Sequence, residues 1–406
     1  MPTRRCRSRG ARIPPTRRWR RSWPRCRPCW RRASPSTAAR RSRRRAGGSP
    51  DAGGRSRCPN AATGLPSSEV SGMELTTVAD DEVVFHAGAD VRRHTGLAPD
   101  TEHVLEGIAV RTLPAPGELL CRVATVNDVH FGETECGVIE GVETPVFRVP
   151  EGTEPYPERM NRGAVDEIAA IDPVAVLVKG DLTSNGTDEE YQRFLEVYGG
   201  ALGERMHHIR GNHDAYEGQT TMPSDPVRVD VPGARLLMID TTVPRRAGGG
   251  LDAEQLEWLD DNAAGSEVPV LVFGHHHPWD PSSATRSENY FGIDPDSSER
   301  LVEVVARRPE VVGYFAGHTH RNRVRHFAAT GELPWVEVAS VKDFPGSWAE
   351  YRIFDGGILQ IHRRISTPDA LEWSETCRGL YGDLMDYVAY AFGALSDRCF
   401  PIWSRR

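Results

Sequence analysis

The sequence predicts an α/β fold built on a parallel or mixed sheet. Several apolar runs end in Gly or a polar turn, the pattern of buried parallel strands with loops at their carboxyl ends. Segments with helical spacing separate some of these runs, and strand–helix–strand alternation favours right-handed crossovers within one sheet. The runs are LLCRVATVN (119–127), PVAVLVK (173–179), ERMHHIR (204–210), VPVLVF (268–273) and VVGYFA (311–316).

Further elements are predicted between and after these runs. Helical spacing predicts helices over 158–171, 187–202 and 297–308, and Asp252 is placed to cap another helix that ends near Ala264. Residues 227–243 are typical of a hairpin that turns at Pro232-Gly233. Four later strand patterns suggest a second sheet that packs over the first: NRVRHFAAT (322–330), PWVEVAS (334–340), AEYRIFD (349–355) and GILQIHR (357–363).

The main domain is predicted over 119–365, with a smaller unit on each side. Residues 73–118 predict a partial β appendage with strands VVFHA, VRRH and HVLEGIAVRTL. The phrase GLAPDTEHVLEG within it resembles a turn and strand of fibronectin-type sandwiches, with His103 where that pattern has Tyr. Residues 366–406 predict a helical extension, and we expect its segment 368–398 to pack on the core rather than to form a partner surface.

The net charge of −7 combines two parts of opposite sign. Residues 1–72 carry twenty Arg against Asp51 and Glu69, a balance of +18 that leaves −25 for residues 73–406. The first part is a low-complexity mix of Arg, Pro, Ser and Ala that cannot bury a core. We expect it to be disordered or untranslated, with translation starting at Met73. A nucleic-acid-binding arm is the alternative, whereas an export signal would need an apolar stretch that is missing.

Cysteines and hydropathy bear on the compartment. The CxxC at 26–29 has no second pair and so does not indicate a zinc site. Cys121, Cys136, Cys377 and Cys399 lack disulfide-framework spacing, so we expect reduced thiols in a cytoplasmic protein. No stretch is apolar and long enough to predict a transmembrane segment. The acidic balance of the folded part disfavours nucleic acid as its partner.

Asp, Asn and His side chains follow all five strands. Loops at the carboxyl ends of parallel strands meet at one edge of a sheet, so we expect these side chains to lie together. Imidazole and carboxylate groups bind Zn, Mn, Fe and Co, and this many donors suffice for two ions that share a bridging carboxylate. Two such ions activate water and hold both oxygens of a phosphoryl displacement. The motifs are Asp128-Val129-His130, Gly180-Asp181, Gly211-Asn212-His213-Asp214, Gly274-His275-His276-His277 and Gly317-His318-Thr319-His320.

In this order the motifs D-x-H, G-D, G-N-H-D, H-x-P and G-H-x-H resemble those of the calcineurin-like metallophosphoesterase family. The resemblance covers 119–365 and implies a four-layer α/β/β/α sandwich with two divalent metal ions. It implies His276 as a ligand because the family's ligand lies two residues before a proline, here Pro278. The implied ligands are Asp128, His130 and His320 for one ion, Asn212, His276 and His318 for the other, and Asp181 as the bridge.

The resemblance also implies catalytic roles. His213 would contact the phosphate or protonate the leaving oxygen, with Asp214 holding its imidazole in place. The nucleophile is expected to be metal-bound hydroxide, since no Ser or Cys in a motif lies beside a base. His275, His277 and Asn127 are further candidates for substrate contact, and Asn127 could instead orient the neighbouring ligand.

The predicted function is hydrolysis of small phosphodiesters, with 3′,5′-cyclic nucleotides as candidate substrates. Asp214 disfavours the protein serine/threonine phosphatases, which have GNHE at this motif. Leu182-Thr183-Ser184 lacks the tyrosine ligand of purple acid phosphatases, but the fibronectin-like strands within 73–118 resemble that branch, which stays a minor alternative. A phosphomonoesterase of the same fold and a non-catalytic scaffold that binds partner proteins are the alternatives. Mn, Fe, Zn and Co all suit this ligand set, and any oligomeric state is compatible with it.

Overall fold

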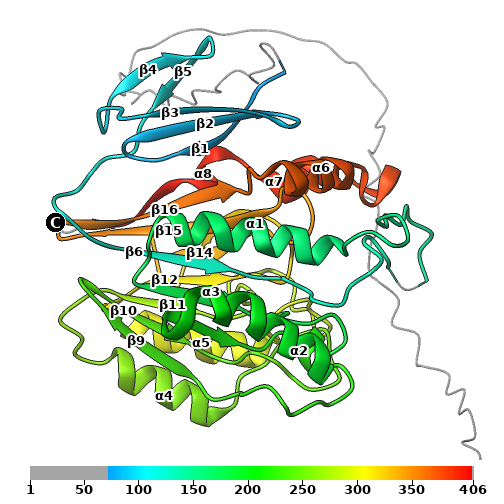
Figure 1. Cartoon of the computed structure of the whole chain (residues 1–406). Helices are drawn as coiled ribbons and strands as arrows, with labels where there is room; N and C mark the ends of the chain where they lie inside the picture. The colour runs from blue at the N-terminus through cyan, green and yellow to red at the C-terminus, as the bar shows by residue number, and fades with distance from the viewer. Residues whose placement is uncertain (1–71, 140, 405–406) are drawn as a thin grey trace, which may run out of the picture. The chain divides into compact units, whose positions relative to one another are not determined.

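Two six-stranded mixed sheets form the frame of the chain in a computed structural model that describes residues 72–139 and 141–404 (Figure 1). The expectations for residues 1–71, including the CxxC, fall outside the described residues. Sheet I has the order β17-β16-β15-β6-β7-β8, with β6 (Leu119–Val126), β7 (Ala175–Lys179), β8 (Met206–Ile209), β15 (Ser347–Phe354), β16 (Gly357–Arg364) and β17 (Phe400–Ser404). Sheet II has the order β13-β14-β12-β11-β10-β9, with β9 (Val227–Val231), β10 (Ala234–Met238), β11 (Val270–Phe273), β12 (Val311–Ala316), β13 (Arg323–His326) and β14 (Pro334–Glu337).

The sheets face each other across an apolar core, and helices cover their outer faces (Figure 1). Val123 and Tyr351 of sheet I and Phe273 and Phe315 of sheet II belong to the central cluster. This arrangement confirms the predicted four-layer α/β/β/α sandwich. The helices on sheet I are α1 (Tyr156–Ala170), α2 (Asp188–Phe194), α6 (Pro368–Thr376) and α7 (Tyr387–Phe392), and those on sheet II are α4 (Ala253–Ala263) and α5 (Pro295–Arg307).

The prediction that the four strands after residue 320 form the second sheet is wrong. Strands β13 and β14 join sheet II, whereas β15 and β16 join sheet I. The five strands that precede the polar motifs are likewise divided, with β6, β7 and β8 in sheet I and β11 and β12 in sheet II. The carboxyl ends of the two sets still lie at the same edge of the sandwich. One contact between them is the hydrogen bond that the Lys179 ammonium, at the end of β7, donates to the carbonyl of Ala316, at the end of β12, at 3.0 Å.

Local sequence accounts for most element boundaries. The side chain of Asp252 accepts the N–H of Gln255 at 2.8 Å and caps α4 where predicted. Pro232-Gly233 turns the chain between β9 and β10. The predicted helix over 187–202 begins with a capping box at Thr187 and continues from α2 through a π turn (Leu195–Gly199) into α3 (Gly200–Leu202).

The residues before the sandwich form two small antiparallel sheets, one of β1 (Glu74–Val78), β2 (Glu82–Ala87) and β3 (Asp90–Thr95) and one of β4 (Glu102–Leu105) and β5 (Ile108–Arg111). The run 103–113, predicted as one strand, is a hairpin. Glu106 and Gly107 have φ of 50° and 80°, so the chain reverses there.

Buried charges join the first of these sheets to sheet I. Arg352 donates to Asp80 at 2.5 Å, and Arg363 pairs with Glu82. Between the two arginines lies Glu350, whose side chain is fully buried and pairs with both. The guanidinium groups outweigh the effect of burial and hold the pKa of Glu350 at about 2. Removing any one of these charged side chains would leave another buried charge without a partner.

Replacing Arg363 with Met should therefore lower the free energy of unfolding by about 3–5 kcal/mol, because Glu350 and Glu82 would stay buried with a lost partner. Urea unfolding followed by circular dichroism measures the change. Arg228→Met is the matched control, since Arg228 pairs with Asp230 at the surface and such pairs contribute about 0–1 kcal/mol. Equal losses in the two variants would contradict a special role for the buried charges.

The carboxyl-terminal segment packs on the core, as predicted, through Trp373, Leu380 and Tyr387. It continues through α8 (Leu395–Arg398) into β17, a strand that sequence reasoning missed and that pairs with β16 at the edge of sheet I. The four described cysteines are free and buried. Over the described residues, none of the helices has both the length and the apolar character needed to span a bilayer.

Candidate metal centre

The predicted ligands occupy unusual backbone conformations where the strands end. A positive φ brings Cβ close to the backbone in any residue but glycine, and costs about 1–3 kcal/mol. Strain of this kind clusters at functional sites. Five of the ten described non-glycine residues with positive φ are predicted ligands: Asp128 (54°), His130 (49°), Asp181 (50°), His318 (69°) and His320 (54°).

Two glycines allow these loops to approach one another. A Cβ at Gly211 would lie 2.3 Å from Oδ1 of Asp181, and one at Gly317 would lie 2.7 Å from Cβ of Asn127. Neither position has room for a side chain. The loop after β8 can therefore reach the loop after β7, and the loop after β12 can reach the end of β6.

Asp128, His130 and His320 form one group of donors, with ligand atoms within 4.8 Å of one another. Nε2 of His320 lies 3.4 Å from Oδ1 of Asp128. The backbone N–H of His318 donates to Oδ2 of Asp128 at 3.0 Å. Since Asp128 follows a strand of sheet I and the two histidines at 318 and 320 follow a strand of sheet II, this group depends on both sheets.

A second group surrounds Asp181. Nε2 of His275 lies 3.3 Å from Oδ2 of Asp181 and 3.1 Å from Oδ1 of Asn212, and the rings of His275 and His318 have centroids 5.2 Å apart. Oδ2 of Asp181 also lies 3.4 Å from Nε2 of His130 in the first group. Asp181 thus stands between the two groups, where a bridging carboxylate would have to be.

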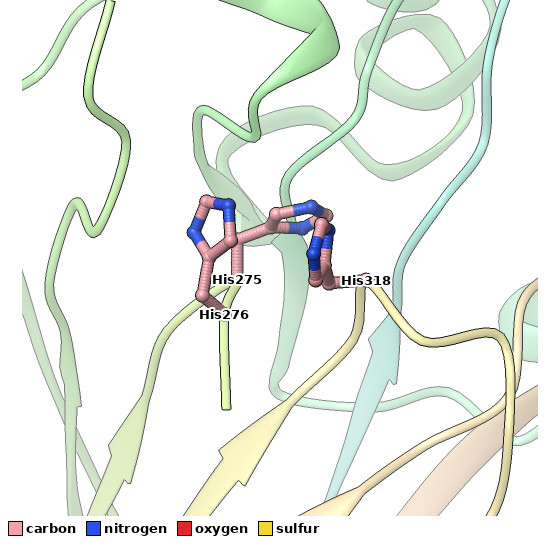
Figure 2. Close-up of side chains that lie close together, drawn as sticks. All are labelled: His275, His276 and His318. Atoms are coloured by element: carbon pink, nitrogen blue, oxygen red, sulfur yellow. The ribbon is translucent and has the colours of Figure 1, made fainter. Parts of the chain in front are cut away.

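The histidines that follow β11 differ in what their rings contact. Figure 2 shows His275, His276 and His318 gathered beyond the ends of two strands, and one nitrogen of each lies within 4.8 Å of the others. Both ring nitrogens of His276, however, have hydrogen-bond partners: Nδ1 lies 2.8 Å from the hydroxyl of Thr241, and Nε2 lies 3.2 Å from the carbonyl oxygen of Ala247. His275 is the one that faces Asp181. The geometry therefore favours His275 as the ligand in place of the predicted His276.

Buried nitrogens without hydrogen bonds test whether metal ions fit these donors. Within 72–139 and 141–404, both ring nitrogens of His130 and Nε2 of His318 are buried and make no hydrogen bond, although carboxylates of Glu133 and Asp181 lie 3.3 and 3.4 Å from the His130 ring. Burial and the Lys342 ammonium lower the pKa of His130 to about 4, and burial with neighbouring histidines holds that of His318 well below its usual value. A buried polar group without a hydrogen bond costs about 1–3 kcal/mol. A neutral imidazole keeps a lone pair on one ring nitrogen, and this is the form that binds divalent metals, so the donors fit.

Residues outside the motifs hold a ligand in place. Nδ1 of His320 lies 2.8 Å from Oδ2 of Asp343, and the hydroxyl of Tyr387 donates to Oδ1 of the same carboxylate at 3.2 Å. A carboxylate on the second ring nitrogen fixes the orientation and tautomer of a ligand histidine. Sequence reasoning missed Asp343, which lies between β14 and β15. Its only signal is the charged pair Lys342-Asp343 within the mostly apolar stretch 338–346.

Asp343→Asn should consequently weaken metal binding about 10–100-fold, the usual loss when such a supporting carboxylate is removed. Titration calorimetry with Mn²⁺ on the metal-free protein measures the dissociation constant. Asp261→Asn, at an exposed position on α4, is the control and should bind Mn²⁺ like the wild type. An unchanged dissociation constant for Asp343→Asn would show that His320 does not depend on this carboxylate.

The predicted support of the His213 ring by Asp214 is wrong. The Asp214 carboxylate accepts hydrogen bonds from the backbone N–H groups of Leu182, Thr183 and Gly211. It thereby ties the loop after β7 to the loop after β8. Nδ1 of His213 instead lies 2.9 Å from the carbonyl of Ser184, which can only accept, so Nδ1 carries a proton. The backbone N–H of His213 donates to Oδ1 of Asp181 at 2.9 Å. The imidazole rings of His213 and His130 have centroids 4.4 Å apart.

Two predicted substrate contacts are enclosed by protein. Asn127 is fully buried, and its amide donates to Oδ2 of Asp128 at 2.6 Å and to the carbonyl of Val338 at 3.1 Å. It orients Asp128, which is the alternative role considered for it. His277 is 4% exposed and packs against Tyr290 with ring centroids 5.1 Å apart. Neither residue faces solvent.

Comparison with known proteins shows which family the chain is similar to. The family described as calcineurin-like phosphoesterase matches residues 121–322. A Synechococcus protein named a probable cyclic nucleotide phosphodiesterase is 30% identical over 201 residues, which cover 47% of this chain and 76% of the relative. The chain belongs to the calcineurin-like phosphoesterase family. The matched range contains every predicted ligand.

Further proteins are similar to parts of this chain. The glycerophosphodiester phosphodiesterase GpdQ of Enterobacter lignolyticus is 32% identical over 40% of this chain and 63% of its own length. A cAMP/cGMP dual specificity phosphodiesterase of Mycobacterium tuberculosis is 28% identical over 36% of this chain and 49% of its own. Among solved structures, a dimetal phosphatase from Danio rerio aligns over 61% of this chain and 98% of its own, with 16% identity and a TM-score of 0.44. The chain thus spans between half and three quarters of these curated relatives.

Proposed function

We propose that this protein is a dinuclear metal-dependent phosphodiesterase. The observation that supports it most is the position of the Asp181 carboxylate, which lies within 4.8 Å of donors from both proposed sites, with His130 in one group and with Asp128 and His275 in another. One ion would be held by the ligands Asp128, His130 and His320, and the other by Asn212, His275 and His318, with Asp181 shared. A complete donor set of this kind weighs against a non-catalytic scaffold.

The ions, when bound, would supply Lewis-acid activation of water and neutralise the charge of the phosphate. The chain itself brings these donor atoms close together. His213 lies beside the Asp181 carboxylate, and its Nδ1 proton is committed to the Ser184 carbonyl. In the imidazolium form, Nε2 would give its proton to the leaving oxygen as that P–O bond breaks and the bond from water to phosphorus forms.

The relatives support a diester as the substrate. Their names describe enzymes for cyclic nucleotides and for glycerophosphodiesters. Both classes have a phosphorus that carries two ester oxygens and a single negative charge. The described residues 73–139 and 141–404 belong to the part of the chain with a balance of −25, so a singly charged substrate meets less long-range repulsion than a monoester dianion would.

Hydrolysis by the full-length protein loaded with Mn²⁺ tests the proposal. The substrates are bis(4-nitrophenyl) phosphate, 4-nitrophenyl phosphate and cyclic AMP, and metal is counted per chain. Two metal ions with turnover of either diester would support it. Turnover of the monoester alone would replace it with a phosphomonoesterase, and absence of both metal and turnover would replace it with a non-catalytic role.

A further inference from the structure

An exposed aromatic side chain lies directly on a predicted metal ligand. Phe291 is 56% exposed, and its ring centroid is 4.1 Å from that of His318, with 30° between the ring planes. One face of the phenyl ring is therefore covered by the imidazole. Its exposed area is left for a group that enters the metal centre from solvent.

The segment that carries Phe291 is tied to the loop after β11. The N–H of Ile293 donates to the carbonyl of His277 at 2.9 Å, and the N–H of Gly249 donates to the carbonyl of Gly292 at 2.8 Å. At Gly292 a Cβ would lie 2.5 Å from the same His277 carbonyl, so the chain passes too close for a side chain. Phe291 is thus held at the centre before any ligand arrives, which lowers the entropy lost on binding.

Two arginines, Arg321 and Arg325, lie near Tyr290, the residue that precedes Phe291. Arg321 and Arg325 share one carboxylate, that of Glu337, at 2.8 Å and 3.5 Å. Arg323 lies between these two arginines in the sequence, at the start of β13. Three guanidinium groups against one carboxylate leave a local surplus that favours an anionic ligand, in contrast to the acidic balance of the folded part.

We propose that Phe291 is the stacking platform for a planar group of the substrate, a nucleobase or an aryl ring attached to the phosphate ester. This inference rests on the proposed phosphodiesterase function and limits its substrates to phosphodiesters that carry a planar ring. Stacking on an aromatic side chain accepts any flat ring, because every base has a π face. Phe291 would therefore select nucleotide-like esters over esters of glycerol.

The test uses the full-length protein loaded with Mn²⁺ and its variants Phe291→Ala, Phe291→Trp and Leu384→Ala. Leu384 is the matched control because it is an apolar side chain with 57% exposure and belongs to the carboxyl-terminal segment. Cyclic AMP and bis(4-nitrophenyl) phosphate carry planar groups, whereas glycerophosphoethanolamine carries none. Calorimetry with AMP and glycerol 3-phosphate measures binding without turnover, and metal is counted per chain.

Phe291→Ala should lower kcat/KM for the two planar substrates about ten-fold and change that for glycerophosphoethanolamine by about two-fold at most. Phe291→Trp should retain turnover of the planar substrates, and all variants should hold the same number of metal ions. Equal losses on all three substrates, or loss of metal, would show that Phe291 only supports His318 and would overturn the proposal. No loss on the planar substrates would overturn it as well.

Binding separates this proposal from the proposed function. If the wild type hydrolyses no diester but AMP binds about ten-fold more weakly to Phe291→Ala and not to Leu384→Ala, the platform stands and the phosphodiesterase assignment falls. If AMP binds equally to the wild type and Phe291→Ala, or to neither, the platform is wrong whatever the turnover.

Discussion

Asp181→Asn should reduce turnover of a phosphodiester by at least about a hundred-fold, the loss that follows removal of one group that stabilises transition-state charge. Asp181 is 2% exposed and lies within 3.4 Å of His130 and His275, which belong to different donor groups. An amide has the same shape but offers one neutral oxygen where the carboxylate offers two charged ones. Both proposed ions would lose their common ligand.

The same variant should lose the stabilisation that metal gives to the wild type. A ligand that binds only the folded state raises the melting temperature in proportion to the logarithm of its concentration. Mn²⁺ should therefore raise Tm for the wild type and for Asp225→Asn, an exposed control, more than for Asp181→Asn. The metal-free proteins should melt at similar temperatures. Equal turnover and equal response to Mn²⁺ in the three proteins would refute the bridging role.

His275→Ala should remove one of two metal ions per chain and most of the activity, whereas His276→Ala should retain both ions. The reason is the difference in ring contacts. Nε2 of His275 lies 3.1 Å from Oδ1 of Asn212 and 3.3 Å from Oδ2 of Asp181. The two ring nitrogens of His276 are instead hydrogen-bonded, one to Thr241 and the other to Ala247. Mass spectrometry under native conditions counts the bound ions directly.

The two variants control for each other, since both residues are fully buried and follow the same strand. Removing either ring leaves a cavity of the same size, so loss of stability alone would affect both alike. The reverse result, with one ion lost from His276→Ala and two kept by His275→Ala, would restore the ligand that the position of Pro278 predicts.

Strands and their polar ends could be predicted from the sequence because each depends on local pattern. The apolar run before Asp128 forms a strand that is buried from Val123 onward, and the one before His318 forms a strand buried throughout. Sheet membership could not be predicted in the same way. Strands β14 and β15 look alike as sequence, but pairing of β15 with β6 spans more than two hundred residues and is decided by packing across the whole domain.

The site shows the same division between local and distant causes. Five short sequence motifs contain the donor residues, and the structure brings donors from all five motifs together. The choice between His275 and His276 depends on which way each ring points, and that follows from Thr241 on another loop. Asp343 and Tyr387 likewise act on His320 from positions with no motif of their own. Such supporting residues are visible only once the chain has folded.

The hydrogen bond from the backbone of His318 to Asp128 has a consequence for the order of events during synthesis. It joins residues that are 190 positions apart, and the Asp343 carboxylate that holds His320 comes later still in the chain. A growing chain that ends at β8 has three of the four proposed ligands of one ion, Asp128, His130 and the shared Asp181, and only Asp181 for the other. Contacts of such long range are slow to form because the chain between the two residues must close first. Metal uptake should thus be among the last steps of maturation, and a partly synthesised chain should hold neither ion tightly.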